Sequence, residues 1–281
     1  PDGGWDGWTT RSVTARGPDR SGCRPWLIER AERPARRVHL WCWNGERWLA
    51  KKIPHQEGDA PDADVMVVDG HWLLATDSGL LREWDGSRLP AIPSAWQGYR
   101  LSAASTKEIW GVWYDNTIRR MRDGAWETTP VPGVSIRKTS SDGRIWPWIN
   151  DIAVVSENEV WAVGNTQLGG PEPKMEYYFD DIVLRWDGRR WHRESLGLKG
   201  ISLKHVIPDG HGGIWVATTG PYMLHHSDGR WTRVPLPTTS GVLMRPRVLD
   251  RVDGSDDAWA ITEASFDAGV LSLVILRHTG R

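Results

Sequence analysis

The chain has 281 residues, and its 35 Lys and Arg nearly balance its 36 Asp and Glu, which leaves a formal net charge of −1 at pH 7. A chain of this kind has no bulk positive field that would recruit nucleic acid or an anionic membrane surface, so we expect neither as a partner. No apolar run approaches the length of about 18 residues that a membrane-spanning helix needs, and no membrane span is expected.

The excess of tryptophan, 20 Trp beside five Tyr and two Phe, indicates an internal repeat that carries it. In chain order, a divergent first copy reads HLWCWNGERWLAKKIP, and five further copies contain Trp72, Trp110, Trp161, Trp215 and Trp259. These five are 38, 51, 54 and 44 residues apart, close to the length of a four-stranded propeller blade. Short β-branched and aromatic runs bounded by Gly, Asp and Asn favour strands over helices. We therefore predict an all-β protein, a single β-propeller of about six four-stranded blades, with five and seven blades left open.

Each copy is predicted to form four strands with the tryptophans at fixed places. Asp-Gly or Asn-Gly suits the positive φ angles of a tight turn, so we place it between the third and fourth strands, at Asn44, Asp85, Asp123, Asp187 and Asp228. The second strand carries the Trp that packs between neighbouring blades; the third ends on Trp43, Trp84 or Trp186, and the fourth begins near Trp48, Trp126, Trp191 or Trp231. We expect these 12 Trp to be core residues, because large aromatic rings are mostly buried.

The repeat also predicts where the blades begin and end. We place them at residues 14–54, 55–93, 94–132, 133–198, 199–237 and 238–281 of one domain, 1–281. The last copy stops at Arg281 before a fourth strand, and Trp8-Thr-Thr-Arg-Ser-Val is similar to Trp231-Thr-Arg-Val. We therefore expect residues 1–13 to complete the last blade, which would close the ring and remove an exposed sheet edge.

Several copies are similar to repeats of known propellers. PDGHGGIWVATTG followed by SDGRW resembles the propeller repeats in sensor domains of two-component regulators, and VWAVG with LRWDGRRW resembles repeats of uncharacterised secreted actinobacterial and myxobacterial propellers. Ser141-Asp142-Gly143-Arg144-Ile145-Trp146 partly resembles the Asp-box of sialidases, but the arginine triad and the tyrosine–glutamate pair of that family cannot be placed. These resemblances imply a fold and not an activity.

The connections between strands differ in length on the two faces of the predicted propeller. The long connections are residues 55–64, 94–99, 133–150, 166–181, 238–247 and 263–269, and all five Tyr and both Phe lie in or beside them. Aromatic rings on loops are typical of a recognition surface, so the candidate ligand-binding residues are Trp96, Tyr99, Trp146, Trp148, Tyr177, Tyr178, Asp180, Tyr222 and Arg245. The alternative, left open, is that these rings only fix the long loops in place.

Some smaller features carry expectations of their own. Neighbouring side chains on a strand point to opposite faces, so one of Asp180 and Asp181 is expected to be solvated. One of His225 and His226 is expected to take the place that Arg185 or Glu83 has in its own copy. No metal site and no cofactor are predicted, because calcium needs about six oxygen donors and no zinc spacing occurs. Cys23 and Cys42 form either one disulfide or two separate thiols, and both alternatives stay open.

Three functions fit these residues. The first is a non-catalytic recognition propeller that binds a glycan or another small polar ligand on the long-loop face. The second is a protein-interaction or assembly module that uses the same face. The third is a lyase or hydrolase at the mouth of the central channel, with His55, Asp180 and Arg245. The chain begins at Pro1 and shows no export signal, so we expect a secreted or periplasmic protein whose signal was removed, with a cytoplasmic one left open.

Overall fold

The computed structural model describes 25 strands and some of the turns and loops that connect them. The described residues are 8–11, 14–15, 24–31, 37–43, 48–52, 65–68, 71–75, 80–84, 91–95, 98–134, 137–138, 144–169, 178–237, 245–251, 258–265 and 271–278. Side chains are described for 98–134, 146–166 and 180–237 and for Met66, Val68, Leu73, Pro246, Leu249, Ala260 and His278. Every regular element in these ranges is a strand, which confirms the all-β prediction, and none of them forms a helix that could cross a membrane.

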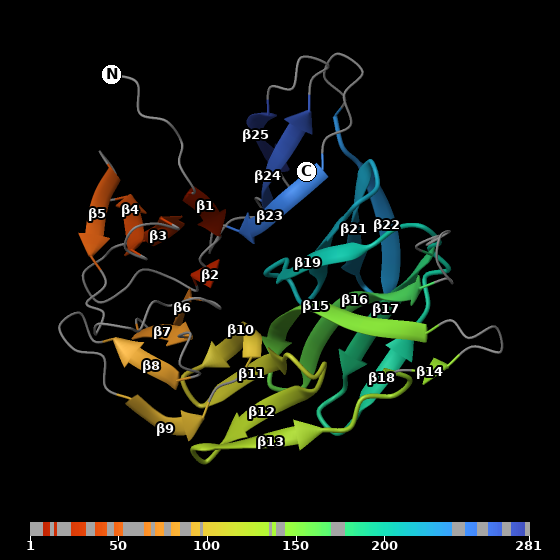
Figure 1. Ribbon diagram of the computed structural model, residues 1–281, viewed down its shortest axis with the longest axis horizontal. Helices are drawn as coiled ribbons and strands as arrows, with labels where there is room; N and C mark the ends of the chain where they lie inside the picture. Colours follow the sequence, from red (N-terminus) through yellow and green to blue (C-terminus); the bar gives the residue numbers. More distant parts are fainter. Residues whose placement is uncertain are drawn as a thin grey trace. The chain divides into compact units, whose positions relative to one another are not determined.

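The described strands form six sheets, and within each sheet most neighbours follow one another in the chain (Figure 1). The first sheet consists of β1 (Trp8–Arg11), β3 (Arg24–Ala31), β4 (Arg37–Trp43) and β5 (Trp48–Lys52). The second consists of β2 (Thr14–Ala15), β6 (Val65–Val68), β7 (His71–Ala75), β8 (Leu80–Trp84) and β9 (Ala91–Ala95). The third consists of β10 (Gly98–Ser105), β11 (Glu108–Trp113), β12 (Ile118–Arg122) and β13 (Ala125–Thr129).

The remaining three sheets lie in the second half of the chain. The fourth, called sheet β14–β18, consists of β14 (Arg137–Lys138), β15 (Arg144–Ser156), β16 (Glu159–Gly169), β17 (Tyr178–Trp186) and β18 (Trp191–Glu194). The fifth, sheet β19–β22, consists of β19 (Leu203–Pro208), β20 (Ile214–Thr218), β21 (Tyr222–Ser227) and β22 (Arg230–Pro235). The sixth has β23 (Arg245–Arg251), β24 (Ala258–Ser265) and β25 (Leu271–His278).

The chain divides into two compact units. The first unit is Pro1–Tyr114 with Arg120–Glu127, and the second is Asp115–Arg119 with Thr128–Arg281. In the first unit, buried Met66 and Leu73 belong to one apolar cluster with Leu101 and Trp113. In the second unit, an apolar cluster joins sheets β14–β18 and β19–β22 through residues such as Trp161, Val163, Val183, Leu203, Val206 and Val216.

The tryptophans of the repeat occupy the predicted strands. Trp110, Trp161 and Trp215 lie on β11, β16 and β20, the second antiparallel strand of each repeat, and are 0%, 0% and 5% exposed. Trp43, Trp84 and Trp186 end β4, β8 and β17, while Trp48 and Trp191 begin β5 and β18. At Asp123-Gly124 and Asp228-Gly229 both residues have φ between +50° and +80°, as a type I′ turn requires.

Trp110 and Trp161, on the second strands of their repeats, are each held by a glutamate and an arginine. Trp110 Nε1 donates to Glu108 Oε1 at 2.6 Å, and Arg120 Nη2 donates to Glu108 Oε2 at 2.6 Å. The Arg120 guanidinium lies over the Trp110 ring, 5.4 Å from its centroid. Glu159, Trp161 and Arg185 repeat this arrangement in sheet β14–β18, with both the indole N–H and Arg185 Nε donating to Glu159 Oε1.

In sheet β19–β22, Asp209 and His225 replace the glutamate and the arginine. The His225 ring stacks on Trp215 with centroids 4.0 Å apart and an interplanar angle of 10°, and its Nε2 lies 2.9 Å from Asp209 Oδ2. His225 is opposite Trp215 in the register, as Arg185 is opposite Trp161. The expectation that one of the two histidines takes the place of Arg185 is thereby confirmed, and the residue is His225.

The amino-terminal strand differs from the prediction. β1 pairs antiparallel with β3, with Trp8 opposite Ala31, so among the described strands it belongs to the first sheet, where the sequence predicted the last blade. β2 pairs parallel with β6, and β23–β25 form a sheet of three described strands. The physical reason is proximity in the chain: closing a short loop between β1 and β3 costs less entropy than pairing the two ends of the chain.

Candidate functional site

The strands β15 and β16 extend well beyond those of the next sheet. They have 13 and 11 residues, whereas β19 and β20 have six and five. Residues 144–150 and 166–169 were predicted as long connections, but Arg144–Ile149 pair with Gly164–Gly169 and so satisfy their backbone groups in a ladder. The aromatic-rich stretch around Trp146 is therefore an extended sheet, which holds its side chains in fixed directions.

A β-bulge separates this extension from the rest of β15. The register shifts by one residue between Ile149 and Asp151, which leaves Asn150 as the extra residue. At the bulge, a Cβ built on Gly164 would lie 1.9 Å from the carbonyl oxygen of Trp148. Only glycine fits so close to a neighbouring strand, so Gly164 sets the backbone position of Trp148.

Trp146 and Trp148 form an exposed aromatic surface on this extension. They lie two residues apart on one strand and therefore on the same face of the sheet, and the two residues are 36% and 42% exposed. Pro147 and Ile149 point to the opposite face and are buried. Every other tryptophan whose side chain the structure describes is buried or half-buried. Two residues along a strand span roughly 6.6 Å, so the two indoles form one surface, called the Trp146–Trp148 face from here on.

Buried polar groups support the inner end of this face. Asn165 is opposite Trp148 and only 4% exposed. Its Oδ1 accepts hydrogen bonds from Asn150 Nδ2 at 2.8 Å and from Ser202 Oγ at 2.5 Å. Asn150 Nδ2 also donates to the carbonyl oxygen of Leu203 at 2.6 Å. These bonds join β15, β16 and the start of β19, and they fix the strand segment that carries Trp148.

The two adjacent acids of β17 have different roles. Asp181 is opposite Asn165 in the register and 5% exposed, and its carboxylate accepts hydrogen bonds from the backbone N–H groups of Leu196 at 2.8 Å and Leu198 at 2.9 Å. Asp180 is exposed and points to the opposite face. This confirms the expectation that one of the pair is solvated. It also means that Asp180 does not share a face with Trp148.

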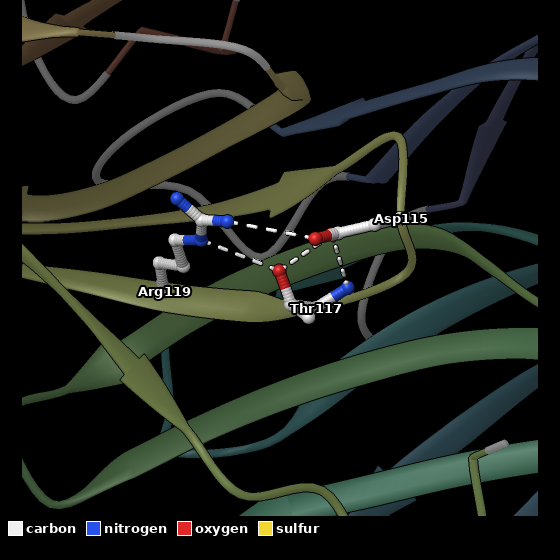
Figure 2. A network of polar contacts seen from close by, with 3 residues as sticks. All are labelled: Asp115, Thr117 and Arg119. Atoms are coloured by element: carbon white, nitrogen blue, oxygen red, sulfur yellow. Dashed lines mark hydrogen bonds and ion pairs between the residues drawn. The ribbon is translucent and has the colours of Figure 1, made fainter.

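The turn that precedes β12, residues 115–117, contacts β15 near Trp148. Asp115 lies beside Thr117 and Arg119 (Figure 2). Its Oδ1 accepts hydrogen bonds from the backbone N–H of Thr117 at 3.0 Å and from the Thr117 Oγ1 at 2.6 Å, and Arg119 Nη2 lies 3.5 Å from Asp115 Oδ2. Burial alone would raise the pKa of Asp115, but the Thr117 hydrogen bonds and the Arg119 charge outweigh it and lower that pKa. Asn116, at φ +61°, accepts a hydrogen bond from the Ile149 N–H at 3.2 Å, which fixes the turn against β15.

The edge of β15 beside Trp146 is poor in free backbone donors. Arg144 and Ile145 pair with β14, and the Ile149 N–H donates to Asn116. Between them, Pro147 has no N–H at all. Because an added strand needs a row of donors and acceptors, this edge is unsuited to pairing with another chain, and recognition here depends on the side chains of the face.

The other predicted residues either belong to other sheets or lie outside the part of the chain that the structure describes in full. Tyr99 and Tyr114 form a ring pair in the first unit, with centroids 5.3 Å apart, and Tyr114 is 69% exposed. Tyr222 lies on β21, half-buried, with the Arg233 guanidinium 5.1 Å from its ring centroid. Outside the described residues, or in strands whose side chains are not described, lie His55, Trp96, Tyr177, Tyr178, Arg245, Cys23 and Cys42.

Asp209 and His225 stabilise the turn before β20 through hydrogen bonds to the Asp209 carboxylate. Burial alone would raise the pKa of Asp209, but hydrogen bonds from the His211 N–H, from His225 and from the Gly213 N–H lower it overall. Sequence reasoning missed Asp209 as this partner; the signal was an Asp at the head of a Gly-rich turn, where its carboxylate caps the following N–H groups. No group of three or more His, Cys, Asp or Glu side chains suited to a metal ion occurs in the part of the chain that the structure describes.

Comparison with known proteins supports the fold and no closer relationship. No protein-family model matches the chain, and no curated protein matches it. The solved structure of YCF48 bound to D1 peptide is similar over 96% of this chain and 78% of its own, with a TM-score of 0.55 and 12% identity. YCF48 from Cyanidioschyzon merolae is similar over 90% of this chain and 76% of its own, with a TM-score of 0.51 and 13% identity. Together with the four-stranded antiparallel sheets, this likeness shows that the chain has a β-propeller fold.

Proposed function

We propose that this chain is a non-catalytic interaction module that binds an extended segment of a protein partner on the Trp146–Trp148 face. The observation that carries the proposal is the contrast between these two residues and the rest of the tryptophans. The other tryptophans whose side chains the structure describes are buried or half-buried, whereas Trp146 and Trp148 are exposed on strand residues that the repeat does not require.

The exposed area is large enough to anchor a partner. A Trp residue presents up to about 250 Å² when fully exposed, so exposed fractions of 36% and 42% leave roughly 200 Å² of accessible surface on the two residues. At about 25 cal/mol per Å², covering it would contribute roughly 5 kcal/mol before the entropy of binding is subtracted. Tryptophans of this kind are the residues that dominate the energetics of protein interfaces.

The polar surroundings favour a peptide over a sugar. A glycan site needs side chains that hydrogen-bond sugar hydroxyls beside the stacking rings. Next to Trp148, however, Asn165 Oδ1 and both carboxylate oxygens of Asp181 already accept hydrogen bonds within the protein, and Asp180 points to the opposite face. YCF48, whose fold is similar, has been solved with D1 peptide, which supports the view that this fold can present a peptide-binding surface.

The partner segment is expected to bind through its side chains and not as an added strand. Pro147 removes a backbone donor from the β15 edge, and Asn116 occupies the next one. An extended segment whose apolar or proline side chains pack on indole rings needs no such ladder. We also propose that the propeller has six blades, one for each of the six sheets that the described strands form.

A selection for binding peptides tests the proposal. A displayed library of short random peptides would be selected on the folded chain, and the dissociation constant of an enriched peptide would be measured for the wild type, Trp148→Ala and Trp148→Phe. Loss of the exposed ring is expected to cost about 2 kcal/mol, which is roughly 30-fold in the dissociation constant. Trp148→Phe keeps an aromatic ring and is expected to lose less.

A matched control and a glycan array complete the test. Glu127→Ala changes an exposed residue of β13, and we expect it to leave the dissociation constant unchanged. Unaltered peptide binding by Trp148→Ala would show that the face is not the site. Binding to glycans on an array, lost in Trp148→Ala, together with no enriched peptide, would favour the glycan function predicted from the sequence instead.

A further inference from the structure

One buried histidine has no role in the repeat or in the proposed binding face. His226 lies on β21 between Ile214 and Trp231 in the register and is 6% exposed. Its Nδ1 has no hydrogen-bond partner among the residues that the structure describes. An imidazole nitrogen that is buried without a partner carries a cost that grows when the ring is charged, because the charge then loses its hydration as well.

His226 sits at the joint between two sheets. Its ring centroid lies 4.7 Å from that of Trp161 on β16 and 4.9 Å from that of Trp231 on β22. The two indoles are themselves 5.7 Å apart, edge to face. Trp161 belongs to sheet β14–β18 and Trp231 to sheet β19–β22, so this triangle of rings is a contact between the sheets as well as within one of them.

The charged groups around the joint are already engaged. Glu159 of β16 accepts from the indole N–H of Trp161 and from Arg185 of β17, and Glu194 of β18 accepts from the indole N–H of Trp231 at 3.1 Å. His225, next to His226 in β21, points to the opposite face and pairs with Asp209. The hydrogen bonds that hold the two indoles therefore use the same carboxylates that a charged His226 would attract.

We propose that His226 is an acid-sensitive lock, which as a neutral ring holds sheets β14–β18 and β19–β22 together and as a protonated ring loosens their contact. Protonation places a charge in a ring whose Nδ1 has no acceptor among the described residues. It also draws Glu194 and Glu159 away from the indoles that they hold. The inference goes beyond the proposed binding function and does not depend on it.

The electrostatic balance acts in the same direction. Burial lowers the pKa of His226 below its ordinary value of 6.5. The negative charges of Glu194 and Glu159 raise this pKa, whereas Arg185 and His225 lower it further. The unfolded chain therefore takes up the proton first as the pH falls. The stabilisation by neutral His226 is fully present above pH 6.5 and is lost as the pH falls through the lower pKa of the folded state.

The test compares the pH dependence of unfolding in three proteins. Denaturant midpoints of the wild type, His226→Gln and His211→Gln would be measured between neutral pH and about pH 5, the range in which histidine titrates. His211 is an exposed residue in the turn before β20, so its variant controls for the loss of a histidine. We expect the wild type and His211→Gln to lose stability with the same slope on acidification, and His226→Gln to show a shallower slope. An unchanged slope in His226→Gln would overturn the lock.

A second measurement keeps the inference testable if His226→Gln does not fold. The pKa of His226 in the wild type would be read from the ring signals of histidine in NMR spectra recorded over the same pH range. A value below 6.5, with ring signals of Trp161 and Trp231 that move together with it, is expected. A value at or above 6.5 would contradict the proposal, because protonation would then stabilise the folded state.

Discussion

Gly164 offers a quantitative test of how the extension positions Trp148. In Gly164→Ala the new Cβ would lie 1.9 Å from the Trp148 carbonyl oxygen and 2.9 Å from the Ile149 Cα, both backbone atoms that no side-chain rotation can move. Real Cβ contacts stay beyond 3.0 Å, so the strands would have to separate by at least about 1 Å. Overpacking of this kind costs about 3 kcal/mol. Because Trp148 moves with its backbone, binding of the selected peptide should also weaken, although Gly164 itself touches no partner.

The assay for this prediction is equilibrium unfolding in denaturant, with Gly197→Ala as the matched control. Gly197 has φ +66° but nothing within 4 Å of its Cβ position, so its variant bears only the cost of a left-handed conformation, about 1 to 2 kcal/mol. We expect Gly164→Ala to lose clearly more stability than Gly197→Ala. An equal or smaller loss would refute the close approach of β15 and β16 at the bulge.

Two further predictions concern buried polar groups. Asp181→Ala removes the acceptor of two backbone N–H groups and is expected to lower the free energy of unfolding, measured by heat or denaturant, by about 3 kcal/mol. Asp180→Ala changes an exposed residue and should alter the same free energy by less than about 0.5 kcal/mol. Equal effects would contradict the different roles of the two acids. Glu108→Ala removes the carboxylate that accepts hydrogen bonds from the Trp110 indole N–H and from Arg120, and we expect it to lower the free energy of unfolding by about 3 kcal/mol. Glu108→Gln should recover part of this loss. No change in Glu108→Ala would show that this cluster does not stabilise the sheet.

The repeat was predictable from the sequence because its chemistry is local. A Trp two residues after Glu108 or Glu159, followed by an Asp-Gly turn, defines a strand, a tight hairpin and a buried ring without reference to the rest of the chain. The turns at Asp123 and Asp228 have the predicted positive φ angles for the same reason. Pairing over longer distances carries no such local signal, and so β1 pairs with β3 where the sequence suggested the last blade.

The residues of the Trp146–Trp148 face stood out in the sequence, but their local structure did not. Trp146 and Trp148 were predicted as ligand-binding residues on a long connection, whereas the structure places them, exposed, on strand β15. Arg144–Ile149 and Gly164–Gly169 form strands because they pair with each other, and neither stretch has enough alternation of its own to show this. The buried roles of Asn165 and Asp181 depend on contacts with Ser202 and the Leu196–Leu198 backbone, which are distant in the sequence.

The most direct measurement of the proposed function observes the two indoles themselves. In protein labelled with ¹⁵N at tryptophan, the indole N–H signals of Trp146 and Trp148 would be assigned from Trp146→Phe and Trp148→Phe and followed as a selected peptide is added. We predict that these two signals shift on binding, while those of buried Trp161 and Trp215 do not. Saturable binding of the peptide without a change in either exposed indole would contradict the proposal.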